Sequence, residues 1–174
     1  MDRSIKIVPL IYPPNFILNE MKLKFEEIFK FPVLIEKNLK VPDYYKNLSR
    51  KQYNVSKLIF YLKEKFKSDF LKIIGVISED IYDEGYNFVF GLAELNGKYA
   101  IVSLYRLFDK DKNLYLDRAI KESIHELGHT FGLNHCNNKN CVMSFSLSIN
   151  DVDKKDKYFC KLCETKLRIS LNNL

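Results

Sequence analysis

The most informative stretch of this sequence is His125-Glu126-Leu127-Gly128-His129-Thr130-Phe131-Gly132-Leu133-Asn134-His135. It holds all three histidines of the chain, at spacings of four and six residues. A helix places residues i and i+4 on one face, so His125 and His129 can bind one metal ion from a single helical turn. Glu126 follows the first histidine directly and lies beside that face. The pattern therefore predicts a helix that carries a metal site.

The chain is expected to leave this helix at Gly132, because only glycine adopts a left-handed turn without penalty. That turn returns His135 toward the helix as a third ligand. Three protein ligands and one open position are typical of a catalytic zinc site. Glu126 is then the candidate catalytic residue, placed to take a proton from a zinc-activated water. A chance HExxH in an amphipathic helix is the alternative, and the extension to His135 argues against it.

The four cysteines form a second pattern directly after the histidines, C-x4-C followed by C-x2-C. Two short pairs joined by a longer loop are typical of a structural zinc site with four thiolates. Two disulfides or a redox-active C-x2-C are the alternatives, and the lack of a secretory signal argues against an oxidising compartment. Two zinc ions per chain, one catalytic and one structural, are therefore expected. The predicted structural ligands are Cys136, Cys141, Cys160 and Cys163.

Met143 follows the second cysteine by two residues, and here the sequence resembles a known family. HExxHxxGxxH followed by a methionine is similar to the metzincin clan of zinc peptidases, in which a methionine-bearing turn packs beneath the metal. The interleaved cysteines resemble those of the archaemetzincins, small metallopeptidases with a second zinc bound by four cysteines. The match is dense over residues 125–163 and general elsewhere. The resemblance implies a twisted mixed sheet of about five strands, helices on one side of it, and an edge strand that pairs with extended substrate.

Hydrophobic periodicity predicts a single compact α+β domain over residues 1–174, and the resemblance implies that this domain is metzincin-like. Asn15 is the expected N-cap of the first helix, and Asn96-Gly97 a two-residue type I′ hairpin turn. Residues 41–50 are expected to form an exposed loop. Gly128 is expected to let its helix lie close to the sheet or the metal loop. Strands are expected at 5–10, 33–35, 73–77, 88–95 and 99–107, and helices at 15–30, 54–67, 115–131 and 156–170.

The hairpin strand 88–95 is the best candidate for the substrate-pairing edge, although an interior strand is equally compatible with its sequence. An edge strand would hold a peptide substrate through main-chain hydrogen bonds, which are indifferent to the substrate's sequence.

Composition and charge limit the partners. The chain is 47% hydrophobic and 29% charged, which indicates a globular protein. Charges on both sides of Ile5 argue against a signal peptide, and no segment approaches the ~20 apolar residues of a membrane span, so a cytoplasmic location is expected. The net charge of +6 permits a nucleic-acid partner, but the lysines mostly occupy polar helix faces, among them those of 154–157. A monomer without nucleic acid or membrane partners is expected.

The resulting hypothesis is a zinc-dependent peptidase that cleaves small or unfolded peptides, with an aminopeptidase-like preference as one option. The alternative is a non-enzymatic zinc-binding adaptor or nucleic-acid-binding module, which the basic charge and the four-cysteine pattern favour. The intact Glu126 argues against the alternative, because a purely structural site has no use for a carboxylate beside an open position.

Overall fold

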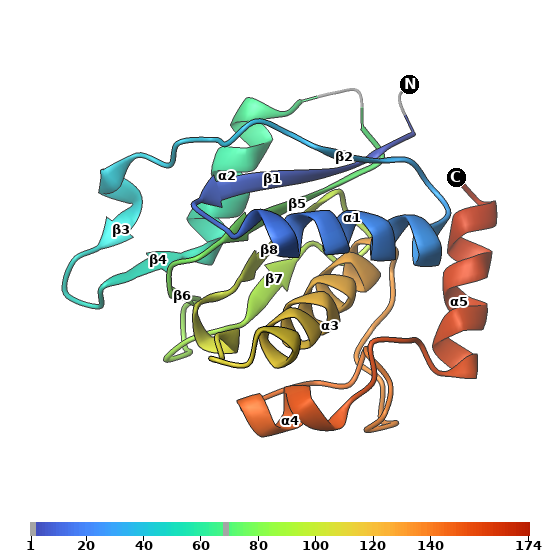
Figure 1. Cartoon of the computed structure of the whole chain (residues 1–174). Coiled ribbons are helices and arrows are strands. Elements are labelled where there is room, and N and C mark those ends of the chain that lie inside the picture. Colours follow the sequence, from blue (N-terminus) through green and yellow to red (C-terminus); the bar gives the residue numbers. More distant parts are fainter. Residues whose placement is uncertain (1–2, 68–69) are drawn as a thin grey trace.

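The computed structural model describes residues 3–67 and 70–174 and contains a five-stranded mixed sheet covered by helices (Figure 1). Neighbouring strands are parallel, except that the last one runs antiparallel to its neighbour. The expected mixed sheet is therefore confirmed. The strands lie in the order β2 (Val33–Ile35), β1 (Ile5–Ile11), β5 (Lys72–Ile77), β8 (Tyr99–Ser103) and β7 (Gly91–Ala93).

Strand β7 forms one edge of this sheet, as expected for residues 88–95. The strand itself is shorter than predicted and covers only Gly91–Ala93. Likewise β8 ends at Ser103, and the chain continues into a short 3₁₀ helix at Tyr105–Leu107.

Two hydrophobic cores lie on the two faces of the sheet, because successive strand residues point to opposite sides. In β1, Ile5 and Ile7 belong to one core, whereas Val8 and Leu10 belong to the other. Strand β5 is buried along its whole length, as its continuous apolar run predicts.

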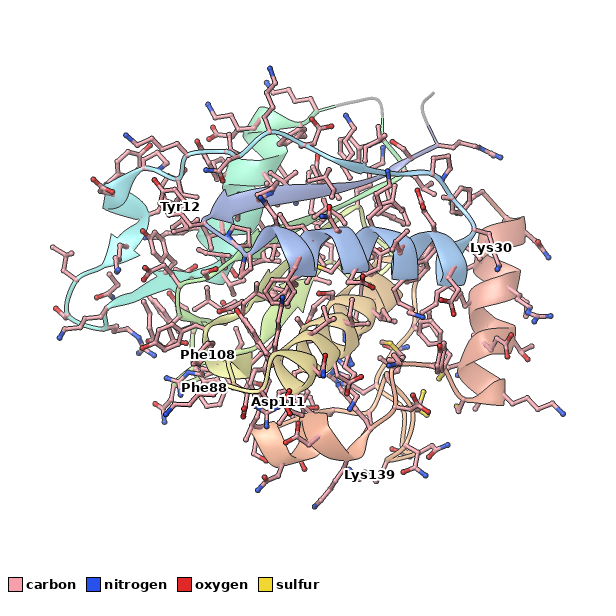
Figure 2. The ribbon with its side chains drawn as sticks, viewed as in Figure 1. Tyr12, Lys30, Phe88, Phe108, Asp111 and Lys139 are labelled. Atoms are coloured by element: carbon pink, nitrogen blue, oxygen red, sulfur yellow. The ribbon has the colours of Figure 1, made fainter. Side chains whose placement is uncertain are left out.

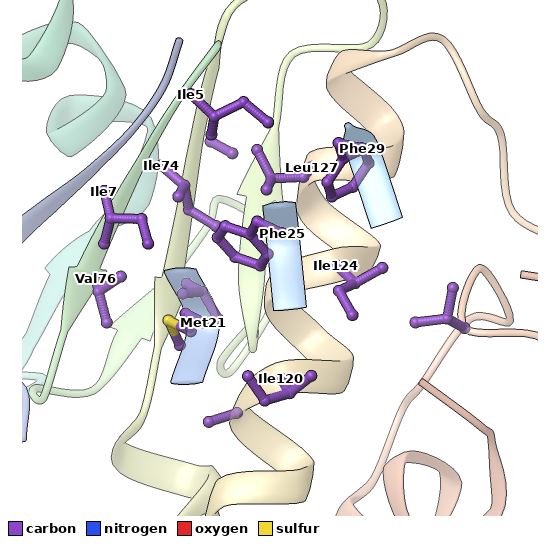
Figure 3. Close-up of a cluster of buried hydrophobic side chains, with 14 of the residues drawn as sticks. Ile5, Ile7, Met21, Phe25, Phe29, Ile74, Val76, Ile120, Ile124 and Leu127 are labelled. Carbon is purple, nitrogen blue, oxygen red and sulfur yellow. The ribbon is translucent and has the colours of Figure 1, made fainter. Parts of the chain in front are cut away.

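Helices α1 (Asn15–Phe29) and α3 (Lys112–Thr130) pack in the first core (Figure 3). Helix α2 (Val55–Lys65) packs in the second core. Helices therefore cover both faces of the sheet, which corrects the one-sided arrangement that the resemblance implied. The apolar face of α3 includes Ile124 and Leu127, so the opposite side of this helix is left for the histidines.

Two local expectations in the N-terminal half were wrong. Asn15 is the first residue of α1 and not its cap; Pro14 precedes the helix without a side-chain hydrogen bond. Residues 41–50 include a strand, β3 (Lys46–Asn47), which pairs with β4 (Gln52–Asn54). Strand β4 in turn pairs with β6 (Ile81–Tyr82) in a second, three-stranded sheet.

The connection between β7 and β8 is not the predicted two-residue turn. The strands end at Ala93 and resume at Tyr99, and the turn is closed by a bond from Gly97 N to Glu94 O of 3.0 Å. Only Asn96 of the Asn-Gly pair has a positive φ, 55°. The physical reason is a tertiary contact, because Asn96 N donates to His129 O at 2.8 Å and docks the turn on the end of α3.

The C-terminal part departs most from expectation. A short helix, α4 (Ile149–Lys154), was not predicted. Its N-terminus is capped by a capping box between Ser148 and Asp151. The predicted helix 156–170 begins later, as α5 (Lys161–Asn172), with Cys160 at its N-cap. Within the described ranges no helix is long and apolar enough to cross a membrane. Met1 and Asp2 of the charged N-terminus lie outside the described residues.

Candidate metal centres

The three histidines come together at the C-terminal end of α3. Their ligand nitrogens lie within 4.8 Å of one another, and Nε2 of His125 is 3.1 Å from Nε2 of His129. Imidazole nitrogens on a tetrahedral zinc ion, at about 2.0–2.1 Å from the metal, lie roughly 3.3–3.4 Å apart. The spacing of this histidine set therefore suits one zinc ion.

The other ring nitrogens of the helical histidines face backbone carbonyls. Nδ1 of His125 lies 2.8 Å from Val142 O, and Nδ1 of His129 lies 2.7 Å from Leu133 O. A carbonyl only accepts, so each Nδ1 carries the proton and each Nε2 keeps a lone pair for a metal. Burial also lowers the pKa of His125 well below its usual value and that of His129 to about 4, which keeps both rings neutral.

Gly132 turns the chain back, as predicted. Its φ is +87°, and its N–H donates to His129 O at 2.9 Å. This left-handed residue ends the helix and returns the chain to the metal side, where His135 completes the set. The His135 ring is exposed and its centroid lies 4.8 Å from that of Phe145.

Glu126 is buried between its helix and the edge strand. A Cβ added at Gly91 of β7 would lie only 2.6 Å from Cγ and Oε1 of Glu126. The strand can therefore approach this close only because residue 91 has no side chain. Burial raises the pKa of the Glu126 carboxyl well above its usual range, and the nearby Glu122 carboxylate raises it further.

A cavity of about 530 Å³ opens beside the histidines. It is lined by the histidine set and Glu126, by the edge strand β7, and by the segment before β7. Most of its other side chains are apolar, so the cavity offers one reactive end and an apolar body. The large apolar lining residues are Phe88, Phe90, Leu92, Leu95, Phe145 and Leu147.

The four cysteines also come together, and all four are free thiols. Their sulfurs lie within 4.8 Å of one another, and Sγ of Cys136 is 3.8 Å from Sγ of Cys160. Thiolates on one tetrahedral zinc, at about 2.3 Å from the metal, lie roughly 3.8 Å apart. A hydrogen bond from the Cys163 backbone lowers the pKa of Cys160 to about 7, whereas burial raises the pKa of the Cys141 and Cys163 thiols, so the sulfur spacing is what supports a metal site. This cysteine set therefore also suits zinc.

Met143 links the two sets. Its sulfur would lie 2.5 Å from a Cβ at Gly128, so the glycine lets α3 approach the loop that carries the methionine. The expectation that Gly128 permits a close approach is thus confirmed. In the same loop, Cys136 N donates a hydrogen bond to Met143 O at 2.9 Å. The preceding carbonyl, that of Val142, accepts the hydrogen bond from His125.

One buried ion pair beside the site was not expected from the sequence. Lys155 Nζ lies 2.7 Å from Oε1 of Glu122, with side chains 1% and 3% exposed, and also donates to Ser144 O at 3.2 Å. Lys155 was expected on a solvated helix face. Glu122 lies one helical turn before Glu126, so helical spacing could have marked it, but nothing in the sequence around Lys155 predicts its burial.

Comparisons with known proteins agree with this geometry. The family described as Peptidase family M54 matches residues 17–169. The Archaemetzincin of Methanocaldococcus jannaschii is 45% identical over 174 residues, which cover 97% of this chain and 94% of the relative. The crystal structure of Archaemetzincin from Methanopyrus kandleri matches with a TM-score of 0.90 and 38% identity, covering 98% of this chain and 96% of the other. That from Archaeoglobus fulgidus, complexed with malonate, matches with a TM-score of 0.86 and 39% identity, covering 94% and 99%.

Proposed function

Because the chain belongs to peptidase family M54, the archaemetzincins, and is a zinc metallopeptidase, we propose that its two metal centres have different tasks. The histidine set, His125, His129 and His135, holds the zinc at which peptide bonds are hydrolysed. The cysteine set, Cys136, Cys141, Cys160 and Cys163, holds a second, structural zinc. The spacing of the ligand atoms in each set supports this assignment.

In the proposed mechanism Glu126 moves the proton. Zinc supplies Lewis acidity, which polarises the substrate carbonyl and acidifies water. Glu126 accepts the proton of the attacking water and then donates it to the leaving amine. A carboxyl whose pKa is raised by burial holds a proton more readily than a solvated carboxyl does, which suits the later transfer of this proton to the leaving amine.

The edge strand offers a place for an extended peptide. Ser103 N donates to Phe90 O at 2.8 Å and Glu94 N to Tyr99 O at 3.0 Å, so these residues of the β7 segment point their polar groups toward β8. In an antiparallel pair the alternate residues point the other way. Gly91 and Ala93 therefore direct their main-chain groups to the open edge, where a substrate strand can add.

The single observation that carries the proposal is the position of Glu126, which lies in the cavity with the histidine set and against the edge strand. A cavity of this size admits one chain segment, so small or unfolded peptides are the proposed substrates. An aminopeptidase-like preference is one form of this proposal.

Hydrolysis of a diverse peptide library by the zinc-loaded protein tests the function, with Glu126→Ala as the matched control. We expect cleavage by the native protein and none above background by the variant. The positions of the cuts distinguish removal of N-terminal residues from internal cleavage. If neither form cleaves any peptide and the protein instead retains a nucleic acid or protein ligand, the binding-module alternative is correct.

We further propose that residues 1–174 form one domain that acts as a monomer in the cytoplasm. The four free thiols support this location, because thiols stay available for zinc in a reducing compartment. Light scattering during size-exclusion chromatography tests the oligomeric state.

A further inference from the structure

One wall of the cavity is a loop, residues 83–90, which joins β6 to β7. Four consecutive residues, 84–87, are exposed, and the loop contains no helix or strand. In Figure 2 the label of Phe88 marks this loop at the periphery of the molecule. A segment with so little packing of its own is ordered only if other residues anchor it.

The first anchor is Arg50. Its guanidinium donates to Tyr86 O and to Asn87 O, both at 3.0 Å. The same group lies 4.0 Å from the centre of the Tyr82 ring. Gln52, which is buried, donates to Asn87 O as well, at 2.9 Å. Two consecutive carbonyls of the loop are thus fixed by three hydrogen bonds.

The second anchor is Arg106, whose guanidinium lies 4.0 Å from the centre of the Phe88 ring. It is held in place by a two-pronged ion pair with Asp80, at 2.9 and 2.8 Å. Phe88 in turn packs edge-to-face on Phe90 with ring centroids 5.3 Å apart. Both rings line the cavity, so Arg106 fixes a surface that faces substrate.

The two anchors form one network. Gln52 donates to the Asp80 carboxylate at 2.9 Å and accepts from Arg50 at 2.9 Å, so it connects the arginines. The loop that the network holds leads directly into Gly91, the first residue of the open edge.

We propose that Arg50 and Arg106 are positioning residues for substrate binding: they hold residues 86–90 so that the edge strand and the Phe88 ring are ready to receive a peptide. This inference rests on the proposed function. A peptide that binds a preformed wall does not have to order the loop. If the loop is loosened, the free-energy cost of ordering it is subtracted from the binding free energy of every peptide. The lysine variants used below are expected to lower global stability only modestly, because a lysine at position 106 can keep one ion pair with the Asp80 carboxylate, whose side chain is only 10% exposed.

Arg50→Lys and Arg106→Lys test the inference, because lysine keeps the charge but loses the two-pronged and stacking contacts. Arg168→Lys is the matched control, since this exposed residue of α5 pairs only with the nearby Glu164 among its described ion-pair contacts. Two ligands are titrated into the zinc-loaded proteins. One is a tetrapeptide hydroxamate with apolar side chains, and the other is acetohydroxamate, which binds metal but has no peptide part.

For both test variants we expect the Kd of the tetrapeptide hydroxamate to rise about 3- to 10-fold, while the Kd of acetohydroxamate stays unchanged. Hydrogen exchange of the amides of residues 86–93 should accelerate, with a melting temperature lowered by less than about 4 °C. The control variant should match the native protein in every measurement. An unchanged Kd for the peptide ligand, or an equal weakening of both ligands, would overturn the inference. Failure of acetohydroxamate to bind the native protein would instead contradict the proposed zinc site, and the exchange data alone would then decide whether the arginines hold the loop.

Discussion

The histidine centre and the cysteine centre are built in opposite ways. Two of the three histidines lie on α3, a 19-residue helix whose orientation the first core fixes. Three of the four cysteines lie outside helices and strands, and only Cys163 lies in α5. The first centre is therefore prepared by regular structure, whereas the second gathers irregular chain.

The cysteine-bearing loop contacts the histidine centre at His125. Val142 O, in the cysteine-bearing loop, accepts a hydrogen bond from His125, and Met143 O, in the same loop, accepts one from Cys136 N. If zinc on the cysteines orders this loop, the histidine centre depends on the cysteine centre. We expect the reverse dependence to be weaker, because packing in the first core holds α3 whether or not its histidines bind a metal. A site on a helix thus still depends on the order of the loop beneath it.

Cys160→Ser should have the largest effect and tests this asymmetry. Structural zinc contributes directly to folding, with apparent values of about 10–16 kcal/mol in small peptide sites. Loss of one thiolate should free the loop that carries Val142 and Met143 and so weaken both centres. We expect the zinc content to fall from two ions per chain to fewer than one, with a lower melting temperature. The matched control is Lys161→Ser, an exposed neighbour. Loss of the cysteine zinc alone would show that the centres are independent.

Glu126→Ala should abolish activity without touching either metal. General-base catalysis typically contributes about 10²–10⁴-fold, and the glutamate is not one of the proposed ligands. Two zinc ions and an unchanged melting temperature are expected, together with a kcat lowered by that factor. Glu126→Gln, which keeps the size of the side chain, should behave in the same way. Turnover equal to that of the native protein would rule out the proposed role.

His135→Ala should damage the histidine centre and spare the cysteine centre. Two helical ligands remain, so zinc still binds but leaves more easily. We expect a chelator to strip this ion at least about 10–100-fold faster, the loss typical even for removal of a ligand's outer hydrogen-bond partner. The second ion should leave at the native rate, and Asn137→Ala, an exposed neighbour, should change neither rate. Equal acceleration at both sites would contradict the one-way dependence.

A smaller effect is expected from Lys72, which holds the C-terminal end of α3 and should make the stability of the fold depend on pH. Its Nζ donates to Gly97 O and Thr130 O at 2.7 Å each, and burial lowers its pKa to about 8. Between this value and its usual 10.5 the folded chain has lost the proton and the unfolded chain still binds it. Below this window the protonated, buried Lys72 destabilises the fold, and this cost is relieved as the pH rises across the window.

Chemical denaturation of native protein and Lys72→Met at pH 7.5 and pH 10 measures this contribution. We expect the native protein to gain about 1–3 kcal/mol relative to the variant over this range. Lys67→Met, at an exposed lysine, serves as the control for the general effect of removing a charge. A constant difference between native protein and Lys72→Met would contradict the lowered pKa.

Local patterns predicted that the three histidines and the four cysteines would each come together, and long-range contacts explain what these patterns missed. The histidine spacing, the turn at Gly132 and the cysteine pairs are local features, and the structure brings each set together as expected. The Asn96 turn and the burial of Lys155 depend on partners far away in the sequence, His129 and Glu122. Helix α4 is only six residues long, too short for a clear hydrophobic period.

The contact between Gly91 and Glu126 has a consequence for protein engineering. Any side chain introduced at position 91 would meet both the Glu126 carboxylate and the Ile101 carbonyl at 2.6 Å. Directed evolution is therefore not expected to change specificity through this position, even though Gly91 is the first residue of the proposed substrate edge. Variation should be directed to Leu147, which is exposed and lines the same cavity, and not to Phe145, whose ring packs on His135.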